Sequence, residues 1–271
     1  MLLDDTKLDE FNEQGFFVLP SFLPVSLINK LKSEANCWVD ENLRNRSIDY
    51  TKSDKKEPLP TLEIELGQHG WLITHPPLMS ILKKLLGEGF AFHHIHSDRH
   101  DPGQGSKNWH HDYEQYPQSN RSHVMLHALH YLTGLDGTIG DLVVLPGSHK
   151  LICNKDSFDK FGDGKLPGEL VIDNLPAGST IIMHSALMHA RRAKKGGDVS
   201  RYFVDCSYCQ SGVRWPVVKR HWKEILERSL QLGLDRKEFS YMFQKEHFFD
   251  PNHYNLKFKE INKGSLIEKL V

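Results

Sequence analysis

The sequence has 271 residues and a formal net charge of −1, and its 39% hydrophobic and 25% charged residues are typical of a globular protein. This balanced charge gives no overall attraction to nucleic acid or to an anionic membrane, so we expect neither as a partner. No segment approaches the roughly 18 consecutive apolar residues of a membrane span, and residues 1–10 lack the features of a signal peptide. Four cysteines are too few for a disulfide framework in a chain of this length, which favours a cytoplasmic location.

Residues 5–87 predict N-terminal helices, because apolar positions recur at helical spacing between helix start and stop signals. In the clearest case, Pro76 and Pro77 suit a first helical turn and Gly87 suits a helix end. The expected helices begin near residues 6, 24 and 76, a short strand covers 16–19, and a polar, lysine-rich loop covers 49–60.

Between about residues 90 and 210, the pattern changes to short apolar strands separated by turns that contain glycine or proline. Alternation over 122–132 places His127 and Tyr131 on one face of a strand. So many short strands indicate a sandwich or a jelly roll. The expected strands cover 122–132, 142–145, 169–173, 179–190 and 200–210, and a helix covers 217–232.

These elements predict a single domain over residues 1–271, because the chain contains no internal repeat and no low-complexity linker. We expect the mainly β class, with a double-stranded β-helix (a cupin-like jelly roll) core and flanking α-helices. The core covers about 90–210, the N-terminal helices about 5–87, and a C-terminal helical extension about 215–271.

Seventeen histidines raise the expectation of a metal site without locating it. Residues i and i+2 of a strand share a face, so His-x-Asp can place an imidazole and a carboxylate on one ion. About two His-x-Asp or His-x-Glu matches are expected by chance from this composition. Two occur, in His96-Ser97-Asp98 and His110-His111-Asp112, so spacing alone does not choose between them.

Four ordered segments resemble the phytanoyl-CoA dioxygenase family. Residues 10–18 resemble its N-terminal region, and 102–112 contain a Pro-Gly turn before Trp-His-x-Asp. Residues 140–150 match its Gly-x-Leu-x-x-x-Pro-Gly-Ser-His-Lys stretch, and 184–201 resemble its closing strand pair. The four segments together span about residues 8–205, and their order makes the resemblance more specific than any one motif.

The resemblance implies that His110, Asp112 and His189 hold iron(II). Two histidines and one carboxylate, with open positions beside them, form the ligand set of non-haem iron(II) oxygenases. The resemblance also implies that Arg201 binds the C5 carboxylate of 2-oxoglutarate, for which a planar guanidinium offers two parallel hydrogen bonds. Tyr131 is expected beside this cosubstrate.

The implied reaction is oxidation of a C–H bond of a small organic molecule, by hydroxylation, desaturation or ring closure. It consumes 2-oxoglutarate and O2, yields succinate and CO2, and is expected to be supported in vitro by ascorbate. Asp112 argues against the halogenases of this family, which have a small residue in place of the carboxylate. The alternative is a cupin-like metal-dependent isomerase or hydrolase that does not use O2, although it would have no need for Arg201. We expect a monomer or a homodimer.

Several other residues allow a second interpretation. His96 could pair with His94 or Asp98 as metal ligands, and His184 could replace His189 as the distal ligand. Cys206-x-x-Cys209 has zinc spacing but lacks a second pair, so two strand cysteines are favoured over a metal or redox site. His111 and His149 are expected to have packing or structural roles.

A basic run lies beside the expected distal ligand, at Arg191, Arg192, Lys194 and Lys195. A solvated hairpin loop is the favoured interpretation, and an anion clamp for the substrate is the alternative. Ala190 stands where the family has a glycine, which makes resemblance to the substrate of any family member uncertain. The helical extension has no counterpart in the family motifs and could be a lid, a dimer surface or a cap on the barrel.

Overall fold

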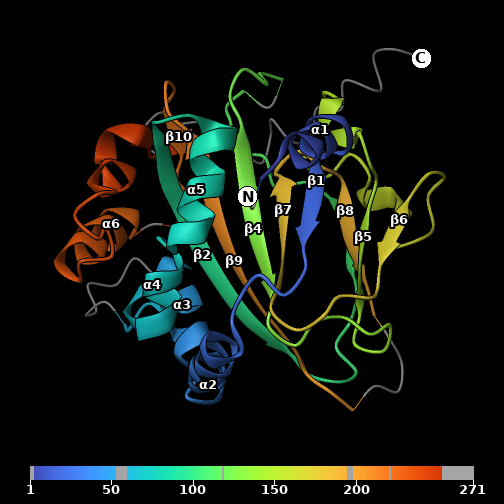
Figure 1. Ribbon diagram of the computed structural model, residues 1–271, viewed down its shortest axis with the longest axis horizontal. Coiled ribbons are helices and arrows are strands. Elements are labelled where there is room, and N and C mark those ends of the chain that lie inside the picture. Colours follow the sequence, from blue (N-terminus) through green and yellow to red (C-terminus); the bar gives the residue numbers. More distant parts are fainter. Residues whose placement is uncertain (1–2, 53–59, 118, 194–197, 220, 252–271) are drawn as a thin grey trace.

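A computed structural model describes residues 3–52, 60–117, 119–193, 198–219 and 221–251. Two antiparallel sheets form the centre of this structure (Figure 1). The five-stranded sheet has the order β1 (Phe16–Leu19), β7 (Ser179–His184), β4 (Met125–Tyr131), β9 (Arg201–Gln210) and β2 (Phe90–His100). The four-stranded sheet has the order β3 (Lys107–His110), β8 (His189–Arg192), β5 (Asp141–Val144) and β6 (Leu170–Ile172).

The chain alternates between the two sheets as it passes from β2 through β3 and β4 to β5, and again from β7 through β8 to β9. Strands far apart in sequence therefore become neighbours: β3 pairs with β8, with His110 opposite His189. The single strand expected over 179–190 is in fact two strands in different sheets. Residues 185–188 make this crossing, where the Leu187 N–H donates to the His184 carbonyl and the Met188 N–H to Ser148 Oγ.

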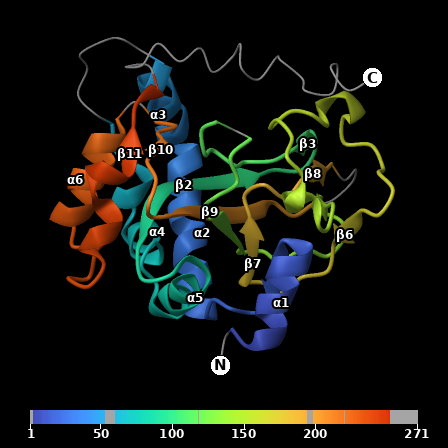
Figure 2. The ribbon, with the colours of Figure 1, turned by 90° about the horizontal axis from the view of Figure 1, so that it is seen from above.

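Helices from both ends of the chain pack on the five-stranded sheet and contribute to one apolar cluster with it (Figure 2). Leu31 and Leu82 of the N-terminal helices are fully buried there with Phe92 and Tyr208 of the sheet. None of the described helices is long and apolar enough to cross a membrane. The α-helices are α1 (Asp5–Gln14), α2 (Val25–Asp40), α3 (Leu43–Lys52), α4 (Gly67–Leu72), α5 (Pro76–Leu86) and α6 (Trp222–Gln231).

The structure corrects two of the expected boundaries. Helix α3 occupies 43–52, so the loop expected to begin at residue 49 begins inside a helix, and 53–59 lie outside the described residues. The helix expected from 217 starts only at Trp222, because the preceding backbone forms a strand pair. In that pair, β10 (Trp215–Pro216) lies parallel to β11 (Phe248–Phe249), and the Val217 N–H donates to the Phe249 carbonyl.

The C-terminal extension belongs to the packing of the sheet in the part of the chain that the structure describes. Leu226 of α6, Phe243 and Phe248 are buried in the same apolar cluster as Phe92. The ring of Phe243 lies 5.8 Å from that of Phe92. This segment covers the sheet rather than extending away from it, and residues 252–271 lie outside the described part.

Candidate active site

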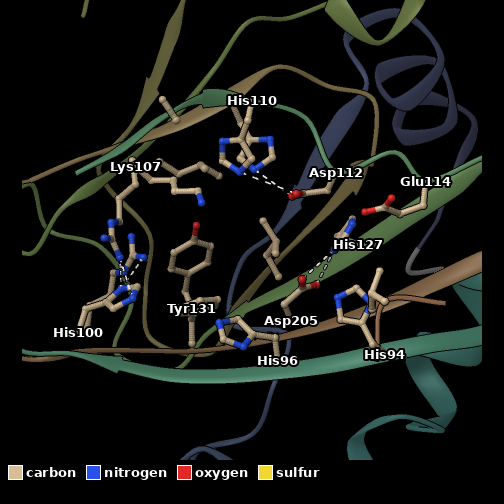
Figure 3. A pocket seen from close by; sticks show the side chains of 18 of the residues that line it. His94, His96, His100, Lys107, His110, Asp112, Glu114, His127, Tyr131 and Asp205 are labelled. Carbon is tan, nitrogen blue, oxygen red and sulfur yellow. Dashed lines mark hydrogen bonds and ion pairs between the residues drawn. The ribbon is translucent and has the colours of Figure 1, made fainter. Parts of the chain in front are cut away.

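Two histidines and an aspartate meet where β3 and β8 lie side by side. His110 ends β3 and His189 begins β8, and their rings are 4.3 Å apart. Asp112 Oδ1 is 3.8 Å from His110 Nε2, and its Oδ2 is 3.3 Å from His189 Nε2 (Figure 3). Asp112 follows β3 rather than belonging to it, and its N–H donates to the Ser185 carbonyl. The predicted ligands are thus brought together, but the carboxylate is held by irregular backbone after the strand and not by strand alternation.

The hydrogen bonds of the two imidazoles fix which ring nitrogen faces the carboxylate. His110 Nδ1 is 2.7 Å from the Asn108 carbonyl, and His189 Nδ1 is 3.0 Å from the Leu187 carbonyl. A carbonyl only accepts, so each Nδ1 carries the proton and each Nε2 presents a lone pair. Metal-binding histidines are usually held in this way. Two nitrogens and one carboxylate oxygen therefore fit a divalent transition metal.

The charges of the group also suit a metal. Burial, together with the neighbouring His189, lowers the pKa of His110 to about 4. Burial by itself would raise the pKa of Asp112, but the close contact with His189 and the nearby His110 hold that pKa well below its usual value. At neutral pH the carboxylate is therefore ionised and the imidazole of His110 is neutral, which is the state that metal binding requires.

A cavity of about 530 Å³ opens beside this group and is lined by both sheets. Its size is typical of a small-molecule site. Arg201 and Arg191 lie at one end, where both contact His100. Arg201 is 5% exposed, and its Nε has no hydrogen-bond partner among the described residues. Figure 3 shows His100, Lys107 and Tyr131 at this end.

Arg201 is the residue of this end best suited to hold an anion. Its guanidinium carbon is 5.8 Å from the ring centre of Tyr131 and 5.3 Å from that of Phe203. Within the described part of the chain, it forms no ion pair with a carboxylate, and burial lowers its pKa. A buried cation without a counter-charge is costly. An entering carboxylate would therefore be stabilised here.

The two arginines of the basic run, Arg191 and Arg192, point in different directions. Arg191 points into the cavity, so the solvated-loop interpretation is wrong for it. Arg192 points away and forms two 2.7 Å bonds to the Glu169 carboxylate. Arg191 also lies near Arg201, because both arginines contact His100. Lys194 and Lys195 lie outside the described residues.

The alternative metal ligands are engaged elsewhere. Asp98 lies 3.0 Å from both His100 and Arg44. His184 Nδ1 accepts the Ala186 N–H, and its ring stacks on Tyr113. In the described ranges, His110, Asp112 and His189 form the one group of histidine, cysteine or carboxylate side chains that brings three possible metal-ligand atoms within 4.8 Å of one another.

Three further interpretations concerned histidines and cysteines outside the site. His111 is fully buried, with Nε2 3.1 Å from the Cys153 carbonyl, as expected of a packing residue. His149 lies in the short 3-10 helix Ser148–Lys150 and contacts the Asn12 carbonyl of α1, so it joins these two segments. Cys206 and Cys209 are free, buried thiols on β9, as the structural interpretation predicted.

Several residues that line the other end of the cavity were not predicted as site residues. His127, Asp205 and Glu114 lie there. Alternation had placed His127 on the same face as Tyr131, and this face does line the cavity. Asp205 follows Arg201 by four residues on the same strand, so the same rule could have found it.

Comparisons with known proteins agree with this geometry. A search of protein families matches residues 11–202 to Phytanoyl-CoA dioxygenase (PhyH), whereas no curated protein matches the sequence. The fold is similar to that of HygX from Streptomyces hygroscopicus with iron bound, at 15% identity and a TM-score of 0.59 over 79% of this chain and 91% of HygX. It is also similar to apo EctD from S. alaskensis, at 17% identity and a TM-score of 0.62 over 81% and 82%. The family match covers more than half of the sequence, and the chain belongs to the phytanoyl-CoA dioxygenase family.

Proposed function

We propose that this protein is an iron(II)- and 2-oxoglutarate-dependent oxygenase that oxidises a C–H bond of a small organic molecule. One observation carries the proposal: a group of two imidazole Nε2 atoms and one carboxylate shares a cavity with the buried cation Arg201. The strand order and the alternation between sheets support a double-stranded β-helix as the core. HygX with nickel and 2-oxoglutarate, and EctD with 2-oxoglutarate and 5-hydroxyectoine, have similar folds.

In this proposal, His110, Asp112 and His189 hold iron(II). Bound iron with 2-oxoglutarate supplies the O2 chemistry that forms succinate and CO2. The carbonyls of Asn108 and Leu187 orient the two imidazoles, and the Ser185 carbonyl fixes the backbone of Asp112. The protein contributes ligand geometry and a cavity that restricts water.

Arg201 binds the C5 carboxylate of 2-oxoglutarate, and Arg191 adds a second positive charge. The cation has no carboxylate of its own among the described residues, so the cosubstrate would supply the missing partner. The rings of Phe203 and Tyr131 lie beside the guanidinium and would shield the ion pair of Arg201 with the C5 carboxylate from solvent. A non-oxidative metal isomerase or hydrolase has no need for this anion site, which favours the oxygenase.

The outcome of the oxidation depends on the substrate. Similar folds include SnoN, a non-heme alpha ketoglutarate dependent epimerase, and SnoK, a carbocyclase, both from nogalamycin biosynthesis. We propose hydroxylation as the reaction here, with desaturation and ring closure as variants of the same C–H oxidation.

The proposal is tested by anaerobic spectroscopy. Iron(II) and 2-oxoglutarate together should give a weak visible charge-transfer band with the wild-type protein. Alanine at His110, Asp112 or His189 should abolish the band, and His96→Ala, on the opposite wall of the cavity, is the matched control. If the band persists in His110→Ala and His189→Ala but is lost in His96→Ala, the assignment of the metal site is wrong.

A second measurement separates the oxygenase from its alternative. Under O2, the protein loaded with iron(II) should form succinate from 2-oxoglutarate, and the true substrate should stimulate this formation. An isomerase or hydrolase would convert its substrate in the absence of O2 and without consuming 2-oxoglutarate.

A further inference from the structure

His127 and Asp205 form a buried pair at the end of the cavity away from Arg201. His127 is 2% exposed, and its Nδ1 lies 2.8 and 2.9 Å from the two oxygens of Asp205. In Figure 3, His127 lies between Asp205 and the segment that carries Asp112 and Glu114. Both members of the pair line the cavity. Neither has a role in holding iron or 2-oxoglutarate.

The second ring nitrogen of His127 is the unusual feature. Nε2 is buried and has no hydrogen-bond partner among the described residues. Buried polar atoms in native proteins are almost always paired with protein or ordered water, because leaving one unpaired costs stability. Here the unpaired atom belongs to a residue that lines the cavity beside the proposed iron ligands, so a bound molecule could supply the missing partner.

The partner of Nδ1 determines what Nε2 can do. A carboxylate accepts, so Asp205 holds the proton on Nδ1 and fixes the ring orientation. Nε2 then accepts a hydrogen bond if the imidazole is neutral and donates one if it is protonated. A hydroxyl group satisfies both states, since it is donor and acceptor at once.

We propose that His127, oriented by Asp205, is the substrate-binding residue of this cavity and that it binds a hydroxyl group of a polar, hydroxyl-bearing small molecule. The inference rests on the proposed function, because it places this molecule beside the iron ligands. Asp205 acts through His127 and is a positioning residue. The pair is distinct from the cosubstrate end: Arg201 and Asp205 are four residues apart on β9, or about 13 Å along a strand.

The charges at this end argue against an acyl-CoA substrate. Besides the proposed ligand Asp112, its described carboxylates are Asp205 and Glu114, and Glu114 is bonded to Lys155. Lys219 is the described lysine of the lining at this end. The described arginines of the lining are instead Arg191 and Arg201 at the cosubstrate end and Arg44 of α3. Within the described residues, such an end offers little to the phosphates of coenzyme A, which basic residues bind. The described lining of this end also forms no continuous apolar wall of the kind that a fatty acyl chain requires, because histidines and carboxylates interrupt it.

Binding measurements test the class of substrate. The protein is loaded with Mn(II) and 2-oxoglutarate without O2 and titrated with cyclitols, sugars, amino sugars and hydroxyamino acids. Acyl-CoA thioesters and fatty acids form the comparison set. We expect binding from the hydroxyl-bearing set. Binding confined to the thioesters or fatty acids, or no binding by any hydroxyl-bearing probe, would overturn the inference.

Substitutions then test the role of His127 in binding. His127→Phe should weaken binding of the best hydroxyl-bearing probe at least tenfold, and Asp205→Asn should weaken it less. Affinity for 2-oxoglutarate should stay within twofold in both variants. The matched control is His123→Phe, which precedes β4 and does not line the cavity. Equal losses in His123→Phe and His127→Phe would contradict the inference. If the wild-type protein did not bind 2-oxoglutarate at all, this result would instead refute the proposed function.

A ligand-free measurement distinguishes binding from a structural role. His127→Leu alone leaves the Asp205 carboxylate buried and unpaired, and should lower Tm. The double variant His127→Leu, Asp205→Leu removes both polar partners, and its Tm should equal or exceed that of the wild type. If the double variant falls as far as the single one, the pair serves stability and the inference is wrong.

Discussion

The anion site predicts a specific result for substitution of Arg201. Its guanidinium is almost completely buried, and its Nε lacks a hydrogen-bond partner in the described part of the chain. The bond from its Nη1 to the Gly140 carbonyl is long, at 3.4 Å. This arginine therefore has unused hydrogen-bonding capacity at the place where we put the C5 carboxylate of 2-oxoglutarate.

The expected loss follows from the bonds that this carboxylate would make. One charge-assisted hydrogen bond contributes about 1.5–3 kcal/mol, and a guanidinium can form two at once. Arg191 contacts the same His100 and would retain part of the attraction. We therefore expect Arg201→Ala to weaken 2-oxoglutarate binding by about 10- to 100-fold, or about 1.4–2.8 kcal/mol. Arg201→Lys should recover part of the loss, because a lysine is a point charge without the fork.

Anaerobic titration of the iron(II)-loaded protein with 2-oxoglutarate measures the effect. Iron(II) affinity without cosubstrate should change little, since Arg201 is not a ligand. Arg192→Ala is the matched control, because that side chain faces away from the cavity and pairs with Glu169. Wild-type affinity in both Arg201→Ala and Arg201→Lys would refute the assignment and weaken the case for an oxygenase.

Three further predictions concern the neighbouring arginine, the response to acid and a strained turn. Arg191→Ala should weaken 2-oxoglutarate binding at least threefold by isothermal titration and leave the KM for the true substrate unchanged; the reverse pattern would restore the substrate-clamp interpretation. Burial lowers the pKa of His130 from its ordinary 6.5 to about 3, so the unfolded chain protonates this histidine at a higher pH than the folded protein does. The contribution of neutral His130 to the free energy of unfolding is therefore fully present above about pH 6.5 and decreases as the pH falls. Urea unfolding at pH 7 and pH 5 should show a loss of up to about 1.4 kcal/mol per pH unit from this residue, which His130→Gln should remove. Gly134 has φ +80°, and an added Cβ would lie 2.3 Å from the Leu175 carbonyl oxygen, so Gly134→Ala should lower the free energy of unfolding by more than about 1 kcal/mol; an unchanged thermal melt would contradict this.

Much of the local structure follows from the sequence because its signals are local. Pro76 and Gly87 bound α5 as expected, and Gly15 ends α1 in the left-handed conformation that glycine favours. Alternation correctly placed His127 and Tyr131 on one face of β4. The helix over 43–52 was missed, because its polar residues lack a clear apolar stripe and its neighbours in the chain resemble a loop.

The sequence by itself determined which residues were candidates for the site and their order, through motifs that span about residues 8–205. Only the tertiary structure decided which candidates meet. The crossing from β7 to β8 carries His189 to His110 and leaves His184 among aromatic rings in the other sheet. Likewise, β8 turns Arg191 into the cavity and Arg192 away from it. The physical reason is that strand period and motif spacing fix which residues share a face, whereas the partner of that face depends on pairing between strands distant in sequence.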